Sequence, residues 1–368
     1  MQTDFFDASQ RTSLDCWAAI LGRKAASSEP ILIPGVAGRR ALVTGAGGFI
    51  GSEMVRVLAA SGAQPIILLE IAERALFALS AKIAARGYGD RCIPILGSLD
   101  NRALLAELFD EHRPEVILHA AALKHVPLME RNPFAAVAIN GIGTWWLAKV
   151  AAEHRARQLI LVSTDKAVAP HSIMGASKRI AELAVLAHPT FATAVRLVNV
   201  IGSPGSVVPL FAEQIASGSP ITVTHRAASR FFMSLNEIVD LLAQAIDASA
   251  RGILVPDPGE PIRISDLAQR MISACGRNVP VFFTAPRPGD KLEESLVSPH
   301  ERCDGSATPG LRRVIGSSAA DLEAQIGALE TAIARRNLPE LLRLVADLVP
   351  DYEPSVLLRQ LTTELAAR

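Results

Sequence analysis

Short apolar runs separated by amphipathic stretches dominate the first half of the chain. The runs predict buried β-strands at residues 41–44, 65–69, 92–96, 116–119 and 159–162. Helices are predicted between them at residues 52–61, 102–112 and 132–150, and Asn132 is expected to cap the last of these. This alternation predicts an α/β fold, a Rossmann-type doubly wound parallel sheet with helices on both faces.

The alternation is expected to end after Arg196. Residues 199–211 predict a loop that leads into a helix, within a smaller C-terminal α/β region. Two or three amphipathic helices are predicted after residue 300, with apolar positions at Leu322, Ile326, Leu329, Leu341, Leu342 and Val345. At the other end, residues 1–38 predict an extension and linker with a short helix at 14–21.

A glycine-rich stretch lies between the first predicted strand and the first predicted helix. Gly45 permits a tight turn, Gly48 lets backbone N–H groups approach a pyrophosphate, and Gly51 allows close packing of the helix on the strand. Its position between a strand and a helix is what gives this pattern weight. It predicts a dinucleotide site lined by Thr44, Gly45, Gly47, Gly48, Phe49, Ile50 and Gly51.

An acidic residue follows at the end of the second strand. Glu70 comes 19 residues after Gly51, close to the spacing at which a carboxylate binds the adenosine ribose hydroxyls. A carboxylate at this position repels a 2′-phosphate, which favours NAD over NADP. Arg74 keeps NADP open as the alternative.

Small residues follow the strand at 116–119. Ala120, Ala121 and Ala122 would let a cofactor lie against the backbone, and Lys124 and His125 are candidates to reach the phosphate or sugar of a substrate. The simpler interpretations are that Lys124 is solvated and that His125 is packed. For His125, the packing role and the substrate-binding role are evenly balanced.

Composition excludes several functions. Lys+Arg and Asp+Glu both total 37, so there is no net charge to attract nucleic acid or an anionic membrane. The four cysteines show no metal-ligand spacing, so neither zinc nor another metal is expected, and reduced thiols suit the cytoplasm. No uncharged apolar run reaches the roughly 18 residues of a membrane span, and the N-terminus has no secretory pattern.

An acid and a base stand side by side after the strand at 159–162. Ser163 and Thr164 lead into Asp165 and Lys166. In doubly wound sheets, chemistry is found at the carboxyl ends of the strands. This pair is therefore the candidate acid–base site.

Taken together, the motifs resemble those of the UDP-N-acetylglucosamine 4,6-dehydratases, the CapD-like polysaccharide biosynthesis proteins of the extended short-chain dehydrogenase/reductase superfamily. The resemblance runs from about residue 39 to about residue 300. It rests on separated blocks at residues 43–53, 120–130, 163–168, 174–179, 199–203, 205–211, 230–233 and 287–291. Membrane-bound relatives carry spanning helices, and this chain resembles the soluble branch.

In short-chain dehydrogenases, a tyrosine four residues before a lysine transfers the proton. Here Lys178 is present, but position 174 is methionine, which can neither donate nor accept a catalytic proton. The two tyrosines, Tyr88 and Tyr352, lack a lysine at that spacing. One branch of the family carries this methionine, so the resemblance moves the acid–base work to Asp165 and Lys166.

The resemblance implies a reaction that oxidises C4 of a hexose, eliminates water across C5 and C6, and returns the hydride to C6. It implies Asp165 as the acid, Lys166 as the base, Thr164 as a hydrogen-bond partner of the C4 hydroxyl, and Lys178 as a ligand of the cofactor beside Ser163. Lys166 would need a pKa roughly 3 units below its usual value, with Lys178 as a contributing charge. The C4 proton could leave through Thr164, a water or Asp165.

The resemblance also implies a UDP-sugar site. Its expected residues are Lys124, His125, Asn199, Val207, Val208, Pro209, Leu210, Phe211, Arg230, Arg287 and Asp290. The two arginines suit phosphate because a guanidinium donates as a fork. The sequence departs from the family at Ser98, next to Leu99 near the expected adenine site, and at Pro204, Asp290 and Glu293; these departures bear on the sugar and on cofactor affinity.

The expected organisation is an NAD-binding domain at 39–198, a nucleotide-sugar region at 199–300 and a helical segment at 301–368. Residues 132–150 and 174–188 are the expected face for self-association into a dimer or larger oligomer. A nucleotide-sugar 4-epimerase and a non-catalytic NAD-binding regulator remain the alternatives to a dehydratase.

Overall fold

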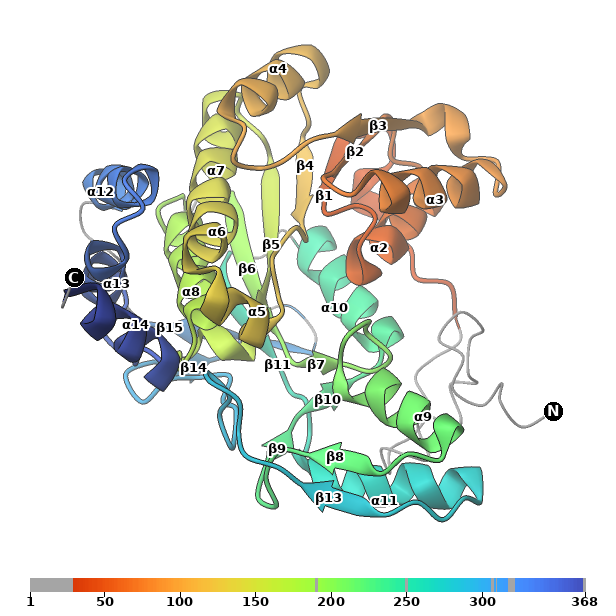
Figure 1. Ribbon diagram of the computed structural model, residues 1–368. Coiled ribbons are helices and arrows are strands. Elements are labelled where there is room, and N and C mark those ends of the chain that lie inside the picture. The colour runs from red at the N-terminus through yellow and green to blue at the C-terminus, as the bar shows by residue number, and fades with distance from the viewer. Residues whose placement is uncertain are drawn as a thin grey trace.

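A nine-stranded sheet organises the molecule, in the order β14-β15-β11-β6-β5-β4-β1-β2-β3 (Figure 1). The computed structural model describes residues 29–188, 191–248, 251–305, 308, 310–316 and 322–366. The strands from β3 to β11 all run parallel, and β15 and β14 add an antiparallel edge. Their bounds are β1 Ala41–Thr44, β2 Ile66–Glu70, β3 Cys92–Leu96, β4 Val116–His119, β5 Gln158–Thr164, β6 Ala192–Leu197, β11 Gly252–Pro256, β14 Arg302–Asp304 and β15 Leu311–Ile315. The predicted Rossmann-type α/β fold is thereby confirmed.

Helices cover both faces of this sheet. One face carries α2 (Phe49–Ala60), α3 (Glu73–Ala84) and α10 (Leu235–Asp247). The other carries α4 (Arg102–His112), α7 (Gly143–Glu153) and α8 (Ile173–Leu186), on the opposite side of the strands in Figure 1. Each crossover thus returns the chain to a parallel strand, as the alternating pattern requires.

The strand order reverses between β1 and β4. From β1 the chain moves outward through β2 and β3, and then returns to β4 on the other side of β1. In register, Thr44 at the end of β1 is paired with Leu69 of β2 and with His119 of β4. In open α/β sheets, ligands bind in the crevice at such a switch point, outside the carboxyl ends of the strands.

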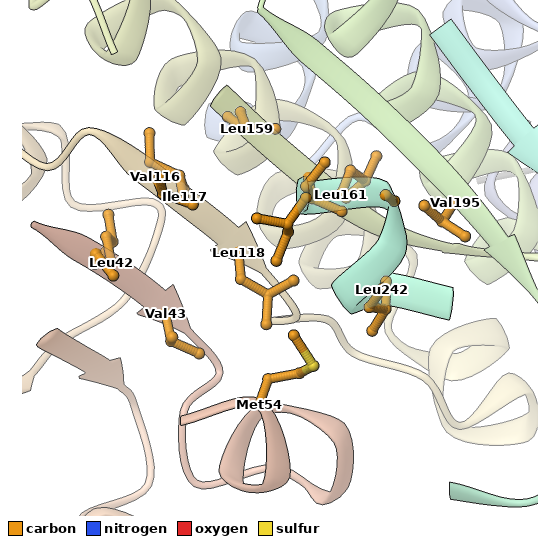
Figure 2. Packing of buried hydrophobic residues seen from close by; sticks show 14 of the residues in the cluster. Leu42, Val43, Met54, Val116, Ile117, Leu118, Leu159, Leu161, Val195 and Leu242 are labelled. Atoms are coloured by element: carbon orange, nitrogen blue, oxygen red, sulfur yellow. The ribbon is translucent and has the colours of Figure 1, made fainter. Parts of the chain in front are cut away.

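The main core covers both faces of the sheet, and on one face it lies under α2 and α10. Figure 2 shows Met54 of α2 and Leu242 of α10 directed at the central strands, where Val43 and Leu118 meet them. Val43, Met54 and Leu242 are fully buried, and Leu118 is nearly so. This packing fixes the first turn of α2 against the end of β1.

Several element bounds differ from those predicted. Helix α2 begins at Phe49, three residues before its expected start, because the glycine loop runs directly into the first turn. Strand β2 begins after Pro65, which has no N–H for a ladder, and it includes Glu70. Beyond Arg196 the alternation does not stop at once, since β11 joins the sheet in parallel beside β6. The predictions for residues 1–28, including the helix at 14–21, concern residues outside the described part of the chain.

The long helix predicted at 132–150 is interrupted. It consists of α6 (Pro133–Ala136), a π-helical turn at Val137–Ile142, and α7. Asn132 does not cap it with its side chain, because Nδ2 donates to the carbonyl of Leu128 in the preceding helix α5 (Val126–Arg131). By length and mean hydropathy, 1.2, the run Pro133–Glu153 could cross a membrane, but 72% of it is buried inside the protein. It is packed as a core helix.

A smaller region follows β6. Three two-stranded sheets pair β7 (Asn199–Val200) with β10 (Phe232–Met233), β8 (Ile221–Val223) with β13 (Val281–Phe283), and β9 (Ser229–Arg230) with β12 (Ile262–Arg263). Helices α9 (Val207–Ser217) and α11 (Ile264–Cys275) pack on each other and on β8. This region has its own hydrophobic cluster and lies below the large sheet in Figure 1.

Three C-terminal helices cover the outer side of α6–α8. These are α12 (Leu322–Ala334), α13 (Leu338–Leu348) and α14 (Val356–Ala366). They are preceded by strands β14 and β15, which the sequence pattern did not predict. The six apolar positions predicted to be buried here are all buried. They form one cluster with Ile142, Trp145 and Leu183.

This arrangement changes the expected surface for self-association. Residues 132–150 and 174–188 were expected to face a second copy, but in this chain their outer face packs against α12 and α13. Trp146 illustrates the contact, since its Nε1 donates to Glu330 Oε1 of α12 over 2.7 Å. The expected interface was wrong in its location, because the chain's own helices fill it.

Candidate active site

The glycine loop between β1 and α2 is packed too closely for side chains. Gly45 has φ +64°, and its N–H donates to the carbonyl of Leu69 over 2.8 Å. A Cβ on Gly45 would lie 2.7 Å from Cα of Ala121, and one on Gly51 would lie 2.1 Å from the carbonyl oxygen of Gly45. Gly48 is the N-cap of α2 and provides no capping side chain. The first turn of α2 thus points its N–H groups and positive dipole end at the switch point.

Glu70 lies beside this loop. Its Oε2 accepts from the N–H of Gly47 and its Oε1 from those of Ile71 and Ala72, each over 3.0 Å. The carboxylate is therefore held at the end of β2, next to the glycines, as the spacing predicted. Arg74 is exposed on α3.

A buried hydrogen-bond chain crosses the ends of β1 and β4. Thr44 Oγ1 lies 2.7 Å from His119 Nδ1, and His119 Nε2 lies 2.8 Å from Thr144 Oγ1. Thr144 donates to the carbonyl of Asn140, so it accepts from His119 Nε2–H, and Thr44 donates to Nδ1. Burial lowers the pKa of His119 well below 6.5, with the charge of Lys178 as a smaller cause, and the ring is neutral. The hydroxyl of Thr44 is committed to this chain, with Thr44 fully buried.

Asp165 and Lys166 form the centre of the site. They begin a short 3-10 helix, Asp165–Ala167, at the carboxyl end of β5. Lys166 Nζ donates to Asp165 Oδ1 over 2.9 Å, and Thr164 Oγ1 donates to the same oxygen over 2.9 Å. Asp165 is fully buried, and its Oδ2 has no hydrogen-bond partner within the described part of the chain.

A second carboxylate faces Lys166 from the smaller region. Glu294 Oε1 lies 3.5 Å from Lys166 Nζ and 3.8 Å from Arg230 Nε, while Glu294 Oε2 lies 3.7 Å from Lys291 Nζ. Burial favours a lower pKa for Lys166, but the attraction of Asp165 and Glu294 outweighs burial and raises the pKa above 10.5. The expectation of a lowered pKa was therefore wrong, and Lys166 is a cation.

Helix α8 carries Met174 and Lys178 to the same strand end. Lys178 Nζ donates to the carbonyl of Val162 over 2.8 Å, and burial lowers the pKa of Lys178 to about 8. Met174 is 3% exposed and belongs to the cluster shared with the C-terminal helices. Ser163, at the end of β5, donates to Glu182 Oε1 of α8 over 2.7 Å.

Some of the candidate substrate residues lie close together. Lys124 Nζ donates to Ser203 Oγ over 2.8 Å and to the carbonyl of Pro204 over 3.1 Å. His125 packs on Gly205, where a Cβ would lie 2.4 Å from His125 Cε1. Asn199 Oδ1 lies 3.4 Å from Lys166 Nζ. The loop before α9 thus closes against the residues after β4.

Other candidates have different roles. Val208 and Phe211 are buried in the cluster of the smaller region, and the side chain of Leu99 is also core, so these side chains do not line a ligand site. The guanidinium of Arg230 donates to the carbonyls of Ser229, Lys291 and Leu292. It holds the segment that carries Glu294.

The remaining candidates lie at the edges of the site. Arg287 forms an ion pair with Asp290 over 2.9 Å, with the Arg287 side chain 58% exposed. Partial or full exposure is shared by Phe49, Ile50, Ser98, Ala120, Ala122, Val207, Pro209 and Leu210. These side chains are accessible to a ligand.

Sequence reasoning missed a buried ion-pair network behind the site. Arg196 of β6 is fully buried and donates to both oxygens of Glu182 and both oxygens of Glu301, over 2.7–2.8 Å. Burial acts to raise the pKa of Glu182, but Arg196 and then Arg179 outweigh it and lower the pKa to about 2. The signal was an arginine inside the otherwise apolar run of residues 192–197.

A glycine-rich helix N-terminus at the switch point of a parallel sheet, with a carboxylate at the end of the second strand, defines a protein with a Rossmann-type fold. The chain belongs to the polysaccharide biosynthesis protein family, whose profile matches residues 41–314.

Individual relatives agree with this assignment. The chain is 42% identical over 272 residues to the capsular polysaccharide biosynthesis protein CapD of Staphylococcus aureus, a match that covers 71% of this chain and 45% of CapD. It is 41% identical over 293 residues to the probable polysaccharide biosynthesis protein EpsC of Bacillus subtilis, covering 77% of this chain and 49% of EpsC. The chain thus spans about half the length of these curated relatives.

A solved structure shares the fold. The structure of Pen from Bacillus thuringiensis superposes with a TM-score of 0.70 at 25% sequence identity. The match covers 80% of this chain and 98% of Pen.

Proposed function

We propose that this protein is a nucleotide-sugar 4,6-dehydratase that uses NAD and acts on UDP-N-acetylglucosamine. The observation that carries the proposal is the hydrogen-bonded pair of Asp165 and Lys166 at the end of β5, beside a helix with Met174 in place of a proton-transferring tyrosine. An enzyme that only oxidised an alcohol would need one base. An elimination needs both a base and an acid.

The residues at the switch point fit NAD. The Cβ atoms of residues larger than glycine at positions 45 and 51 would collide with Ala121 and with the loop itself, so these glycines let the loop hold the N-terminus of α2 at the switch point, where a pyrophosphate would bind. Glu70 is placed for the ribose hydroxyls, and its charge disfavours a 2′-phosphate. Bound there, NAD would supply the removal of hydride from C4 and its return to C6. Lys178 would hold the nicotinamide ribose.

The resting ion pair and the reactive form differ by one proton. If the proton of Lys166 Nζ moves along the 2.9 Å bond to Asp165, Lys166 becomes a neutral base and Asp165 a neutral acid. Lys166 then takes the C5 proton, and Asp165 gives its proton to the departing C6 hydroxyl. The elimination thereby restores the ion pair, so no proton is gained or lost by the site.

The proton of the C4 hydroxyl has a route that avoids Met174. Thr164 Oγ1 lies 2.9 Å from Asp165 Oδ1, so its hydroxyl can accept from the C4 hydroxyl and release its own proton to water, because Asp165 already carries the proton from Lys166. When the hydride returns to C6, Lys166 gives a proton back to C5 and regains one from water, so the protons of the full reaction balance. Oδ2 of Asp165 stays available for the leaving group, since no described residue hydrogen-bonds to it.

One observation favours a 4-epimerase as the second candidate. The pKa of Lys166 is raised, and an epimerase, which does not abstract the C5 proton, would tolerate a permanently charged lysine. The Asp165–Lys166 pair would then serve only to bind the sugar.

Mass spectrometry distinguishes a dehydratase from an epimerase. The purified protein should be incubated with NAD and, one at a time, UDP-, GDP- and dTDP-sugars. A dehydratase lowers the mass of the nucleotide sugar by about 18 Da, whereas an epimerase leaves the mass unchanged and alters the hexose. The absence of any product would favour a non-catalytic NAD-binding regulator. The variant Lys166→Ala is the control, because it should lose dehydration but retain NAD.

A further inference from the structure

We propose that Glu294 is a positioning residue for Lys166, one that holds the ammonium in place between turnovers and sets the pH range in which Lys166 acts as a base. This inference rests on the proposed function only for its effect on turnover. Its effect on Lys166 itself exists in the protein without substrate.

The geometry around Glu294 is unusual for a buried carboxylate. Its side chain is 3% exposed, yet its distances to Lys166, Lys291 and Arg230 are 3.5, 3.7 and 3.8 Å. Oε2 has no hydrogen-bond partner within the described residues. Glu294 is therefore held by charge more than by short hydrogen bonds.

Glu182 provides the contrast within the same molecule. Its two oxygens accept from Arg196 over 2.8 Å each, and Ser163 adds a third bond. A carboxylate fixed in this way keeps two elements together and has no capacity left for another partner. Glu294 instead has spare hydrogen-bonding capacity and faces a residue whose protonation changes in the proposed reaction.

Counting charges shows what Glu294 does. The groups that face one another are the carboxylates of Asp165 and Glu294 and the cations of Lys166, Lys291 and Arg230. They come from the end of β5, from β9 and from the segment after β13. When the proton of Lys166 passes to Asp165, both become neutral, and Glu294 remains paired with Lys291 and Arg230. Glu294 thus keeps its cationic partners throughout, and its proximity favours the protonated form of Lys166.

The substitution Glu294→Gln keeps the shape and removes the charge. Lys166 then retains one carboxylate partner instead of two, and its titration midpoint should fall by about one to two pH units. Glu293 is the matched control, because it is the preceding residue on the same segment but is exposed. Glu293→Gln should leave the midpoint where it is in the wild type.

The direct measurement is the pH dependence of Lys166 acylation. The full chain is pulsed with acetic anhydride at a series of pH values, and the acetylated fraction of the Lys166 peptide is read by mass spectrometry. A lower midpoint in Glu294→Gln, with Glu293→Gln unchanged, supports the proposal. An unchanged midpoint in Glu294→Gln overturns it.

A second variant covers the case in which Glu294→Gln does not fold. Glu294→Asp keeps the charge but withdraws it by one methylene, so the midpoint should fall by a smaller amount. No fall in a folded Glu294→Asp protein would overturn the proposal.

Turnover provides an independent test of the role of Glu294. If the wild type dehydrates a UDP-sugar, the acidic limb of its kcat/KM profile should move to lower pH in Glu294→Gln, by the same amount as the acylation midpoint; an unmoved limb would overturn the proposal. If the wild type produces no dehydrated sugar, the proposed function fails, while the acylation result still decides the role of Glu294.

Discussion

Replacing Lys178 with methionine should make the stability of the folded protein less dependent on pH between 7 and 10, although it removes a residue of the proposed active site. The Lys178 side chain is buried, and burial lowers its pKa from 10.5 to about 8, opposed only in part by the attraction of Glu182. In the unfolded chain the amine regains its usual pKa. The unfolded state therefore binds more protons between pH 8 and 10.5, and stability rises with pH through this window.

The magnitude follows from the two pKa values. At ~1.4 kcal/mol per pH unit, the drop from 10.5 to about 8 costs ~3 kcal/mol of folding free energy at pH 7. The cost shrinks to ~2 kcal/mol at pH 9 and ~1 kcal/mol at pH 10. Methionine leaves the carbonyl of Val162 without the 2.8 Å bond from Lys178, which costs roughly 1–3 kcal/mol at every pH. The pH dependence of the difference therefore carries the prediction.

The assay is urea unfolding of wild type and Lys178→Met from pH 7 to 10, without NAD. The free energy of unfolding of the variant minus that of the wild type should fall by ~2 kcal/mol over this range. Lys82→Met, at an exposed position on α3, is the control and should show a constant difference. A difference for Lys178→Met that does not vary with pH would refute the reasoning, since Lys178 would then be equally protonated in both states.

Substitutions at three further positions test the site. Lys166→Ala should abolish turnover and change NAD affinity less than about threefold, as followed by product mass and by fluorescence titration; normal dehydration would remove Lys166 from the mechanism. Met174→Leu should retain activity and Met174→Phe should lose it, because a 3% exposed side chain leaves no room for a ring; total loss in the leucine variant would give the sulfur a role. Gly51→Ala should weaken NAD binding at least about tenfold and lower Tm, because its Cβ would meet the Gly45 carbonyl at 2.1 Å; unchanged affinity by calorimetry would contradict this.

Local pattern predicted the parts of the fold that are local in origin. Strands β1, β3 and β4 and helix α4 have the predicted bounds, because each is a short apolar or amphipathic run ended by polar residues. The π-helical turn at Val137–Ile142 was not predictable in this way, since one added residue per turn leaves the apolar pattern nearly unchanged. Strand β14 was missed because it is an exposed edge strand with little apolar signal, and β15 was missed because two arginines interrupt its apolar residues.

In the site, too, the features of local origin could be predicted and those formed by packing could not. The glycine loop, Glu70 and the pair Asp165–Lys166 could be recognised because the spacing of these residues along the chain determines how they lie in space. Glu294 could not, because it meets Lys166 across 128 positions of sequence (294 − 166) through the packing of two regions. The pKa of Lys166 is raised by the attraction of Asp165 and then of Glu294, which together outweigh burial, so burial alone gave the wrong sign.

The cover that α12 and α13 form over α6–α8 has a consequence for how the protein is made. Helix α8, which carries Lys178, leaves the ribosome well before the residues after 321 that complete its outer packing. Until then Ile142, Leu183 and their neighbours present an apolar face to water, which in a nascent chain invites chaperone binding or association. Helix α8 therefore acquires its final environment only after α12 and α13 have been synthesised, so that folding of the proposed active site awaits these helices.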